Sequence, residues 1–217
     1  MLKNIKAAIF DMDGTLVDSM WVWSKIDIEF LKKRGIALPS DLKDNIEHLS
    51  FTDTAKYFKD RFKLQESIED IMKEWNDMAF EEYSKNIKLK ADADRFLSSL
   101  KTAGIKIALA TSNSQMLLEA SLKNNGVLQY FDVITTTDEV ARGKNFPDIY
   151  LLTAKRLGVT SEECIVFEDI LPAVKGAKAA GMKVVGVFDE YSEHQKIDII
   201  NTADYFINEY KDIIEAV

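Results

Sequence analysis

The chain has 217 residues, and its 28 Lys and Arg against 36 Asp and Glu give a formal net charge of -8 at pH 7. Hydrophobic residues make up 47% and charged residues 29% of the chain, a balance typical of a folded globular protein and not of a disordered or fibrous one. The negative charge disfavours unaided binding to nucleic acid or to an anionic membrane, so we expect neither as a partner.

Cysteine and histidine are scarce. Cys164 is the one cysteine, so no disulfide can form within the chain, and we expect a cytoplasmic protein. The first apolar run, residues 7–10, is far shorter than a signal-peptide core or a membrane span of ~20 residues. The two histidines, His48 and His194, lie far apart in the sequence, which argues against a histidine-rich metal site or a Ser/His/Asp triad.

The first part of the chain predicts one strand followed by a block of helices. Residues 5–10 predict the strand, whereas residues 18 to 89 show only helical periodicity. One helix of the block is expected from about residue 68, where Ser67 and Asp70 resemble a capping pair. We therefore expect a helical cap subdomain, residues 18–88, inserted into a catalytic core made of residues 1–17 and 89–217.

After the block, strands and helices alternate. Apolar runs predict further strands at residues 105–110, 131–135, 164–167, 183–187 and 205–207. Five glycines follow amphipathic runs and are expected to end helices: Gly35, Gly104, Gly126, Gly158 and Gly181. Runs without polar alternation are typical of strands covered on both faces, so we expect an α/β fold with a doubly wound, Rossmann-like parallel sheet.

Polar residues follow four of the predicted strands. Ligands of open α/β sheets bind outside the carboxyl ends of the strands, so these residues are the candidates for a site. They are Asp11 and Asp13 after the first strand, Thr111, Ser112 and Asn113 after the second, Lys144 after the third, and Glu168 and Asp169 after the fourth.

Most of these residues also have an ordinary structural explanation. The Thr-Ser-Asn run could cap the helix that begins near Met116, the Glu168–Asp169 pair could cap the next helix along the chain, and Lys144 could be a solvated surface lysine. The pair Asp11 and Asp13 is harder to explain in this way. A carboxylate that ends a buried strand is costly to desolvate, and such a cost is expected only where the group binds a cation or takes part in a reaction.

A divalent cation would allow the acidic residues to lie close together. Two ionised carboxylates 4 Å apart repel by about 4 kcal/mol at an effective dielectric constant of 20. All the available ligands are oxygens, which suits Mg²⁺ and a substrate phosphate better than zinc. Three carboxylates balanced by Mg²⁺ and Lys144 leave the site near neutral, so that a phosphate dianion could enter. We therefore expect Mg²⁺ as the cofactor and a small-molecule phosphate ester as the partner.

The four motifs together resemble those of the haloacid dehalogenase-like hydrolase superfamily. They are Asp11-Met12-Asp13-Gly14-Thr15, Thr111-Ser112-Asn113, Gly143-Lys144 and Phe167-Glu168-Asp169, in the family's order. The helical insertion is similar to the cap of the β-phosphoglucomutase and phosphoglycolate phosphatase branch. The resemblance covers nearly the whole predicted core.

The resemblance implies a role for each motif. Asp11 would be the nucleophile that becomes an aspartyl phosphate, and Asp13 would protonate the leaving oxygen and later activate water. Thr111, Ser112, Asn113 and Lys144 would hold the phosphoryl oxygens. The Mg²⁺ ligands would be the Asp11 carboxylate, the Asp13 backbone carbonyl and Asp169, with Glu168 acting through water.

Three functions remain open at this point. The family's dehalogenases lack the second aspartate, so Asp13 favours phosphoryl transfer. The family's phosphosugar mutases carry a cap histidine and a cap arginine that would fall near Trp23 and Phe51 here, so we expect a phosphatase, with a mutase as the alternative. Trp21 and Phe51 are candidate substrate contacts in the cap. A receiver-like signalling or binding module is a remote third reading, and we expect a monomer.

Overall fold

The structure, a computed structural model, describes residues 4–46 and 51–214, so His48 lies outside the described residues. The chain forms two compact units. The core unit comprises residues 1–20 and 87–217, and the helical unit comprises residues 21–86. No helix in the described ranges combines the length and the apolar composition that crossing a membrane requires.

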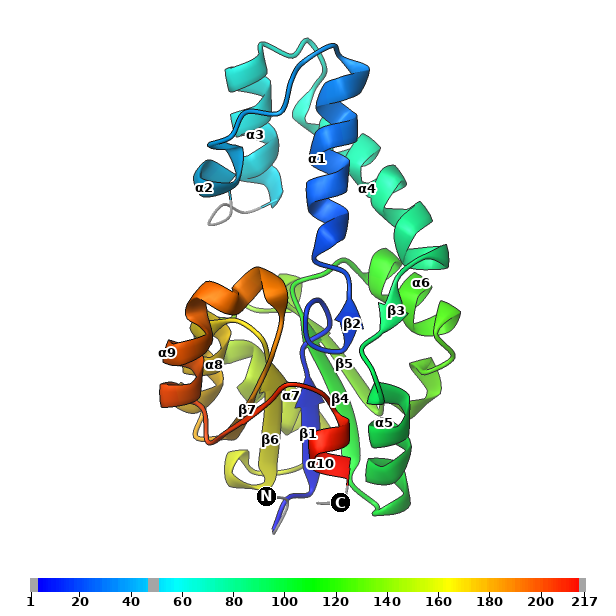
Figure 1. Ribbon diagram of the computed structural model, residues 1–217. Helices are drawn as coiled ribbons and strands as arrows, with labels where there is room; N and C mark the ends of the chain where they lie inside the picture. The colour runs from blue at the N-terminus through cyan, green and yellow to red at the C-terminus, as the bar shows by residue number, and fades with distance from the viewer. Residues whose placement is uncertain (1–3, 47–50, 215–217) are drawn as a thin grey trace. The chain divides into compact units, whose positions relative to one another are not determined.

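A sheet of six parallel strands forms the centre of the core unit, in the order β5-β4-β1-β6-β7-β8 (Figure 1). The predicted α/β fold with a doubly wound parallel sheet is thus confirmed. The strands are β1 (Ala7–Phe10), β4 (Lys106–Thr111), β5 (Val133–Thr136), β6 (Cys164–Glu168), β7 (Lys183–Val187) and β8 (Tyr205–Ile207). Each lies within two residues of its predicted bounds.

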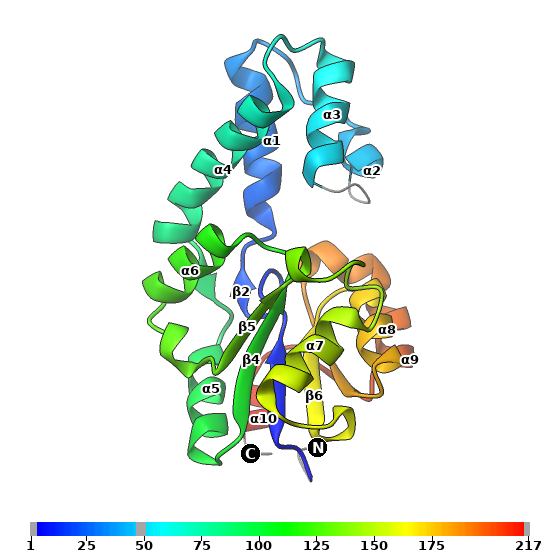
Figure 2. The same cartoon turned by 180° about the vertical axis from the view of Figure 1, so that it is seen from behind.

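Helices cover both faces of this sheet. Helices α5 (Ala93–Thr102) and α10 (Lys211–Ile214) lie in front of the sheet in Figure 1, and α7 (Asp148–Leu157) lies on the opposite face, nearest the viewer in Figure 2. The remaining helices of the core unit are α6 (Gln115–Asn124), α8 (Leu171–Ala179) and α9 (Lys196–Thr202). All five glycines predicted to end helices have a positive φ, between 67° and 78°.

Strand β1 is buried on both faces because its side chains alternate between two apolar layers. Ala7 and Ile9 belong to a buried cluster that includes residues of α7 and α8. Phe10 points the other way and stacks on Phe167 of β6 with the ring centroids 4.5 Å apart, and Phe96 of α5 packs edge-on at 6.1 Å. Burial on both sides explains why this strand reads as an unbroken apolar run.

Two very short strands were missed by the sequence analysis. β2 (Val17–Asp18) and β3 (Lys88–Leu89) pair antiparallel, with Val17 opposite Leu89. Two residues cannot show periodicity, so no pattern could predict them. They belong to the core unit and form its two connections to the helical unit.

The helical unit contains α1 (Trp21–Lys33), α2 (Leu42–Ile46), α3 (Phe51–Phe62) and α4 (Ile68–Lys85). The predicted capping pair is confirmed, since the Ser67 hydroxyl accepts a hydrogen bond from the backbone N–H of Asp70 at 3.0 Å. Aromatic rings fill the interior of the unit. Trp75 packs edge-on against Phe30 at 5.5 Å and against Phe58 at 4.9 Å.

Helix α8 approaches the loop before α7 closely enough to require glycine. A Cβ atom on Gly176 would lie 2.0 Å from the carbonyl oxygen of Lys144 and 3.0 Å from that of Phe146. Both obstacles are backbone atoms, which cannot rotate away. The glycine therefore lets the helix and the loop that carries Lys144 pack in direct contact.

We predict that Gly176→Ala lowers the free energy of unfolding by about 2 kcal/mol, because the added methyl group overpacks this contact. In an ordinary helix interior the same change would raise stability by up to ~1 kcal/mol. Urea denaturation measures the difference. Lys175→Ala, on the exposed side of the same helix, serves as the control and should change stability by less than ~0.5 kcal/mol. A Gly176→Ala chain as stable as the wild type would contradict the prediction.

Candidate active site

Three neighbouring strands bring the candidate residues to one edge of the sheet. Asp11 directly follows β1, Thr111 ends β4, and Glu168 ends β6 with Asp169 next in the chain. Because β1 pairs with both β4 and β6, the carboxyl ends of these parallel strands meet. Lys144 reaches the same place from the loop between β5 and α7.

Lys144 lies between two carboxylates. Its ammonium is 2.6 Å from Oδ1 of Asp11 and 2.5 Å from Oε1 of Glu168, and all three side chains are at most 9% exposed. Burial alone favours the neutral amine, but the charges of Asp11 and Glu168 outweigh it and raise the pKa of Lys144 above its usual range. The solvated surface lysine considered from the sequence is therefore wrong.

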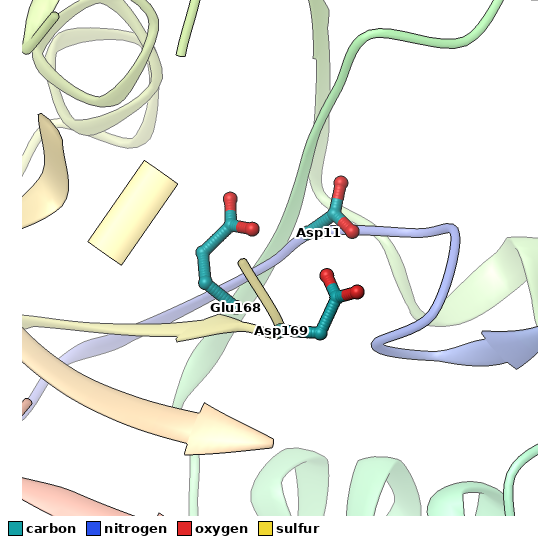
Figure 3. A group of neighbouring side chains, drawn as sticks. All are labelled: Asp11, Glu168 and Asp169. Atoms are coloured by element: carbon teal, nitrogen blue, oxygen red, sulfur yellow. The ribbon is translucent and has the colours of Figure 1, made fainter. Parts of the chain in front are cut away.

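Three buried carboxyl groups face one another at this edge (Figure 3). Asp11, Glu168 and Asp169 each offer an oxygen, and these oxygens lie within 4.8 Å of one another. Burial raises the pKa of Glu168 to about 8, with Lys144 acting against the shift. Burial, and then the charges of Asp11 and Glu168, raise the pKa of Asp169 well above its ordinary value. Burial thus favours the protonated form of two of these carboxyl groups, Glu168 and Asp169.

Two of these carboxyl groups have one oxygen bonded and one open. Oδ1 of Asp169 accepts a hydrogen bond from the Thr15 hydroxyl at 3.1 Å, and Oε1 of Glu168 accepts one from the Tyr150 hydroxyl at 2.8 Å. Oδ2 of Asp169 and Oε2 of Glu168 are buried and have no hydrogen-bond partner. Such atoms are costly unless a ligand occupies them.

The residues present therefore fit a divalent cation. The unsatisfied atoms are carboxylate oxygens, the donor type that Mg²⁺ prefers. Gly14 adds space beside them: its φ is 80°, and a Cβ atom there would lie only 2.3 Å from Oδ2 of Asp169. Asp11, Glu168 and Asp169 could hold the metal, as the sequence analysis expected for these three residues.

The other acidic candidate, Asp13, is half-buried and does not belong to this cluster. Its Oδ1 accepts a hydrogen bond from the Ser19 hydroxyl at 2.6 Å, and its Oδ2 accepts one from the Asn113 side-chain amide at 2.8 Å. Two donors orient this carboxyl group, one from each side. The expected contribution of its backbone carbonyl to a metal stays a prediction.

The polar run after β4 does not cap the following helix. The N-cap of α6 is Ser114, whose hydroxyl accepts a hydrogen bond from the N–H of Leu117. Thr111 is buried, and its hydroxyl accepts a hydrogen bond from the N–H of Asn113 at 3.0 Å, whereas Ser112 is exposed. The run thus forms a turn at the site, with Asn113 linked to Asp13.

The acidic pair after β6 also does not cap a helix. The N-cap of α8 is Ile170, which makes no side-chain capping bond. Glu168 is completely buried and Asp169 is 2% exposed. The capping explanation that the sequence left open is therefore wrong for both motifs.

The two candidate substrate residues belong to the helical unit. Trp21 is half-buried, and the Lys25 ammonium lies 5.8 Å from its ring centroid. Phe51 packs against Trp23 at 5.7 Å and against Trp75 at 5.6 Å. Phe51 is half-buried and thus lies at the border of the aromatic cluster of this unit. Contact of Trp21 or Phe51 with a substrate stays a prediction.

The sequence analysis assigned no role to several residues that form hydrogen bonds within the site. Thr15 and Ser19 carried a usable signal, because both are hydroxyl residues inside or next to the first acidic motif. Tyr150 carried none, since it lies on the apolar face of a helix and is indistinguishable there from a core residue. Tyr210, whose hydroxyl donates to the Thr15 carbonyl at 3.1 Å, lies 195 positions away from it in the chain.

Comparison with known proteins agrees with this fold. The family model described as haloacid dehalogenase-like hydrolase matches residues 8–187. Hexitol phosphatase A of Escherichia coli is 33% identical over 184 residues, which cover 84% of this chain and 82% of that protein. The phosphorylated carbohydrates phosphatase of Thermotoga maritima is 31% identical over 184 residues, or 84% of this chain and 85% of that protein.

A solved structure supports the same assignment. The crystal structure of a candidate β-phosphoglucomutase from Thermotoga maritima is 28% identical, covers 98% of both chains and has a TM-score of 0.80. The chain therefore belongs to the haloacid dehalogenase-like hydrolases, in the branch that contains phosphatases and β-phosphoglucomutases. The family predicted from the four motifs is confirmed.

We predict that Asp169→Asn stabilises the metal-free chain and abolishes its response to Mg²⁺. In the metal-free chain the substitution removes a carboxyl group that burial destabilises, so the thermal midpoint should rise by about 2–4 °C for each kcal/mol gained. Millimolar Mg²⁺ should raise the midpoint of the wild type and leave that of the variant unchanged, because bound ligand stabilises the folded state.

Differential scanning fluorimetry with and without EDTA measures both effects. Asp138→Asn, at an exposed aspartate of the core unit, is the matched control and should respond to Mg²⁺ like the wild type. A wild-type midpoint that does not respond to Mg²⁺ would contradict the metal assignment.

Proposed function

We propose that the protein is a magnesium-dependent phosphatase that hydrolyses a small phosphorylated metabolite through an aspartyl phosphate on Asp11. The observation that carries the proposal is the buried Lys144 ammonium held between Asp11 and Glu168, beside carboxylate oxygens that lack partners. A site of this kind combines a restrained nucleophile with places for a cation and for phosphoryl oxygens.

Asp11 is the proposed nucleophile. Its side chain is largely buried but still 9% exposed, so the phosphorus of a substrate could reach it. Lys144 fixes one of its oxygens at 2.6 Å and carries positive charge where negative charge builds up during phosphoryl transfer. The bond from an Asp11 oxygen to phosphorus forms as the bond from phosphorus to the ester oxygen breaks.

Asp13 is the proposed general acid and base. In the first step it would give a proton to the leaving oxygen, and in the second it would take a proton from the water that attacks the phosphorus of the aspartyl phosphate. The hydrogen bonds from Ser19 and Asn113 orient its carboxyl group for this task. Because dehalogenation needs no such proton donor, Asp13 favours a phosphate ester over a haloacid as substrate.

Magnesium, when bound, would neutralise the acidic cluster and polarise a phosphoryl oxygen. Asp11, Glu168 and Asp169 would hold it, with the Asp13 backbone carbonyl as the further proposed ligand. Thr111 and the backbone N–H groups around Ser112 and Asn113 would donate to the phosphoryl oxygens.

The relatives support a substrate that is a small phosphorylated carbohydrate or a similar metabolite. Two of them, at 33% and 31% identity, are named for hexitols and for phosphorylated carbohydrates. We propose a cytoplasmic monomer that requires neither nucleic acid nor membrane. Cys164 is a buried free cysteine, which is compatible with a reducing compartment.

We predict magnesium-dependent release of p-nitrophenol from p-nitrophenyl phosphate. Asp11→Asn should lower kcat on the order of 10³-fold or more, because the nucleophile is removed while the shape of the side chain is kept. Asp138→Asn should retain wild-type activity. Wild-type protein that turns over no ester at any Mg²⁺ concentration would contradict the proposal and favour a phosphoryl-binding module.

The second candidate function is a phosphosugar mutase, which the match to the candidate β-phosphoglucomutase favours. A mutase must hold a second phosphate group while the bisphosphate intermediate turns over. The positions expected for its cap histidine and arginine are Trp23 and Phe51, and these two rings pack against each other. An aromatic pair of this kind offers no charged group to a phosphate, so we favour the phosphatase.

We predict that phosphate is released faster than glucose 6-phosphate forms when the protein is incubated with β-glucose 1-phosphate and a catalytic amount of glucose 1,6-bisphosphate. Phosphorus NMR follows both products in one sample. The wild-type chain without Mg²⁺ is the control. Faster accumulation of glucose 6-phosphate would establish the mutase instead.

A further inference from the structure

The hydroxyl of Tyr150 reaches the acidic cluster from helix α7. The side chain is completely buried, and its hydroxyl lies 2.8 Å from Oε1 of Glu168 and 3.2 Å from the carbonyl oxygen of Ala173. Phenylalanine would supply the same apolar contact, whereas a buried hydroxyl costs free energy unless it is hydrogen-bonded. The hydroxyl has such a partner, and that partner belongs to the candidate active site.

Glu168 is restrained at one oxygen only. Oε1 accepts from Tyr150 and also lies 2.5 Å from the Lys144 ammonium. Oε2 is buried and has no hydrogen-bond partner. A carboxylate can accept at both oxygens, so two donors on one of them leave the other to be presented to a cation.

Lys144 also contacts Oε1 of Glu168, but its position depends on the state of Asp11, which changes during the proposed reaction. Its ammonium also bonds Asp11 at 2.6 Å, and the charge on Asp11 changes when the proposed aspartyl phosphate forms. The Tyr150 hydroxyl has two acceptors within reach, Glu168 at 2.8 Å and the Ala173 carbonyl at 3.2 Å, and neither residue is proposed to react. The tyrosine can therefore keep Glu168 oriented while the partner of Lys144 changes.

We propose that Tyr150 is a positioning residue of the metal site. Its hydroxyl holds Oε1 of Glu168 so that Oε2 stays directed at the bound cation. The inference rests on the proposed magnesium-dependent function and extends it to a residue outside the four motifs. The Tyr150 hydroxyl should therefore increase the affinity for Mg²⁺ by acting through Glu168. A tyrosine with a purely structural role would leave this affinity unchanged.

The test is isothermal titration of MgCl₂ into the full-length metal-free chain. Tyr150→Phe removes the hydroxyl and keeps the ring, and it should raise the Kd for Mg²⁺ about tenfold, the lower end of what outer ligand partners contribute. Tyr83→Phe is the matched control, because Tyr83 is also fully buried but lies in the helical unit. This control should bind Mg²⁺ with the wild-type Kd.

A kinetic readout separates positioning from general loss of activity. For p-nitrophenyl phosphate, the Mg²⁺ concentration that gives half-maximal rate should rise about tenfold in Tyr150→Phe, while kcat at saturating Mg²⁺ falls less than about threefold. A fall in kcat with no change in Mg²⁺ dependence would overturn the inference.

A double-mutant cycle identifies the residue through which Tyr150 acts. In a Glu168→Gln chain, adding Tyr150→Phe should change the Kd for Mg²⁺ less than about twofold, because the partner of the hydroxyl is already altered. The same tenfold loss in both backgrounds would overturn the inference, and so would a Tyr150→Phe chain that does not fold. A wild-type chain that takes up no Mg²⁺ would instead refute the proposed function itself.

Discussion

The buried ion pair network around Lys144 is the interaction on which the site depends. One ammonium group contacts Asp11 and Glu168, and it must offset the cost of holding three carboxyl groups in a space from which water is almost excluded. It does so incompletely, since the pKa values of Glu168 and Asp169 remain raised. The remaining imbalance is what gives the site its proposed affinity for a divalent cation, and through it for a phosphate ester.

The fold holds this arrangement of charged side chains rigidly. The strands that carry Asp11 and Glu168 are paired neighbours, so the distance between the two side chains is set by the sheet and not by a loop. The loop that carries Lys144 is held in turn by α8, where Gly176 admits the backbone at a distance that no other residue allows. Thr15 and Tyr150 then orient the carboxyl groups. Rigid elements position the groups that the proposed chemistry requires to be fixed.

The features that could be predicted from the sequence are those that depend on neighbouring residues in the chain. Asp11 could be predicted because it directly ends an unbroken apolar strand, and the sheet followed from the alternation of such strands with helices ended by glycine. The alternatives for the polar runs could not be decided, because side-chain capping is defined by hydrogen bonds: Ser114 caps α6, and the N-cap position of α8 is Ile170, which makes no such bond. The roles of Tyr150 and Gly176 could not be predicted for a different reason. Their importance comes from contacts with segments distant in the chain. A tyrosine is common in a helix next to a core, and a glycine inside a helix, although unfavourable there, does not show which segment packs against it.

Burst kinetics of the Asp13→Asn variant with p-nitrophenyl phosphate test the central claim most directly. The p-nitrophenolate group leaves without needing a proton, so Asp11 should still be phosphorylated, whereas hydrolysis of the aspartyl phosphate should be slow without its general base. Rapid-mixing absorbance should show a burst of about one equivalent of p-nitrophenolate per active site, and mass spectrometry of the quenched protein should locate one phosphoryl group on the peptide that contains Asp11. Slow, linear release without a burst, or a phosphoryl group on another residue, would contradict the account.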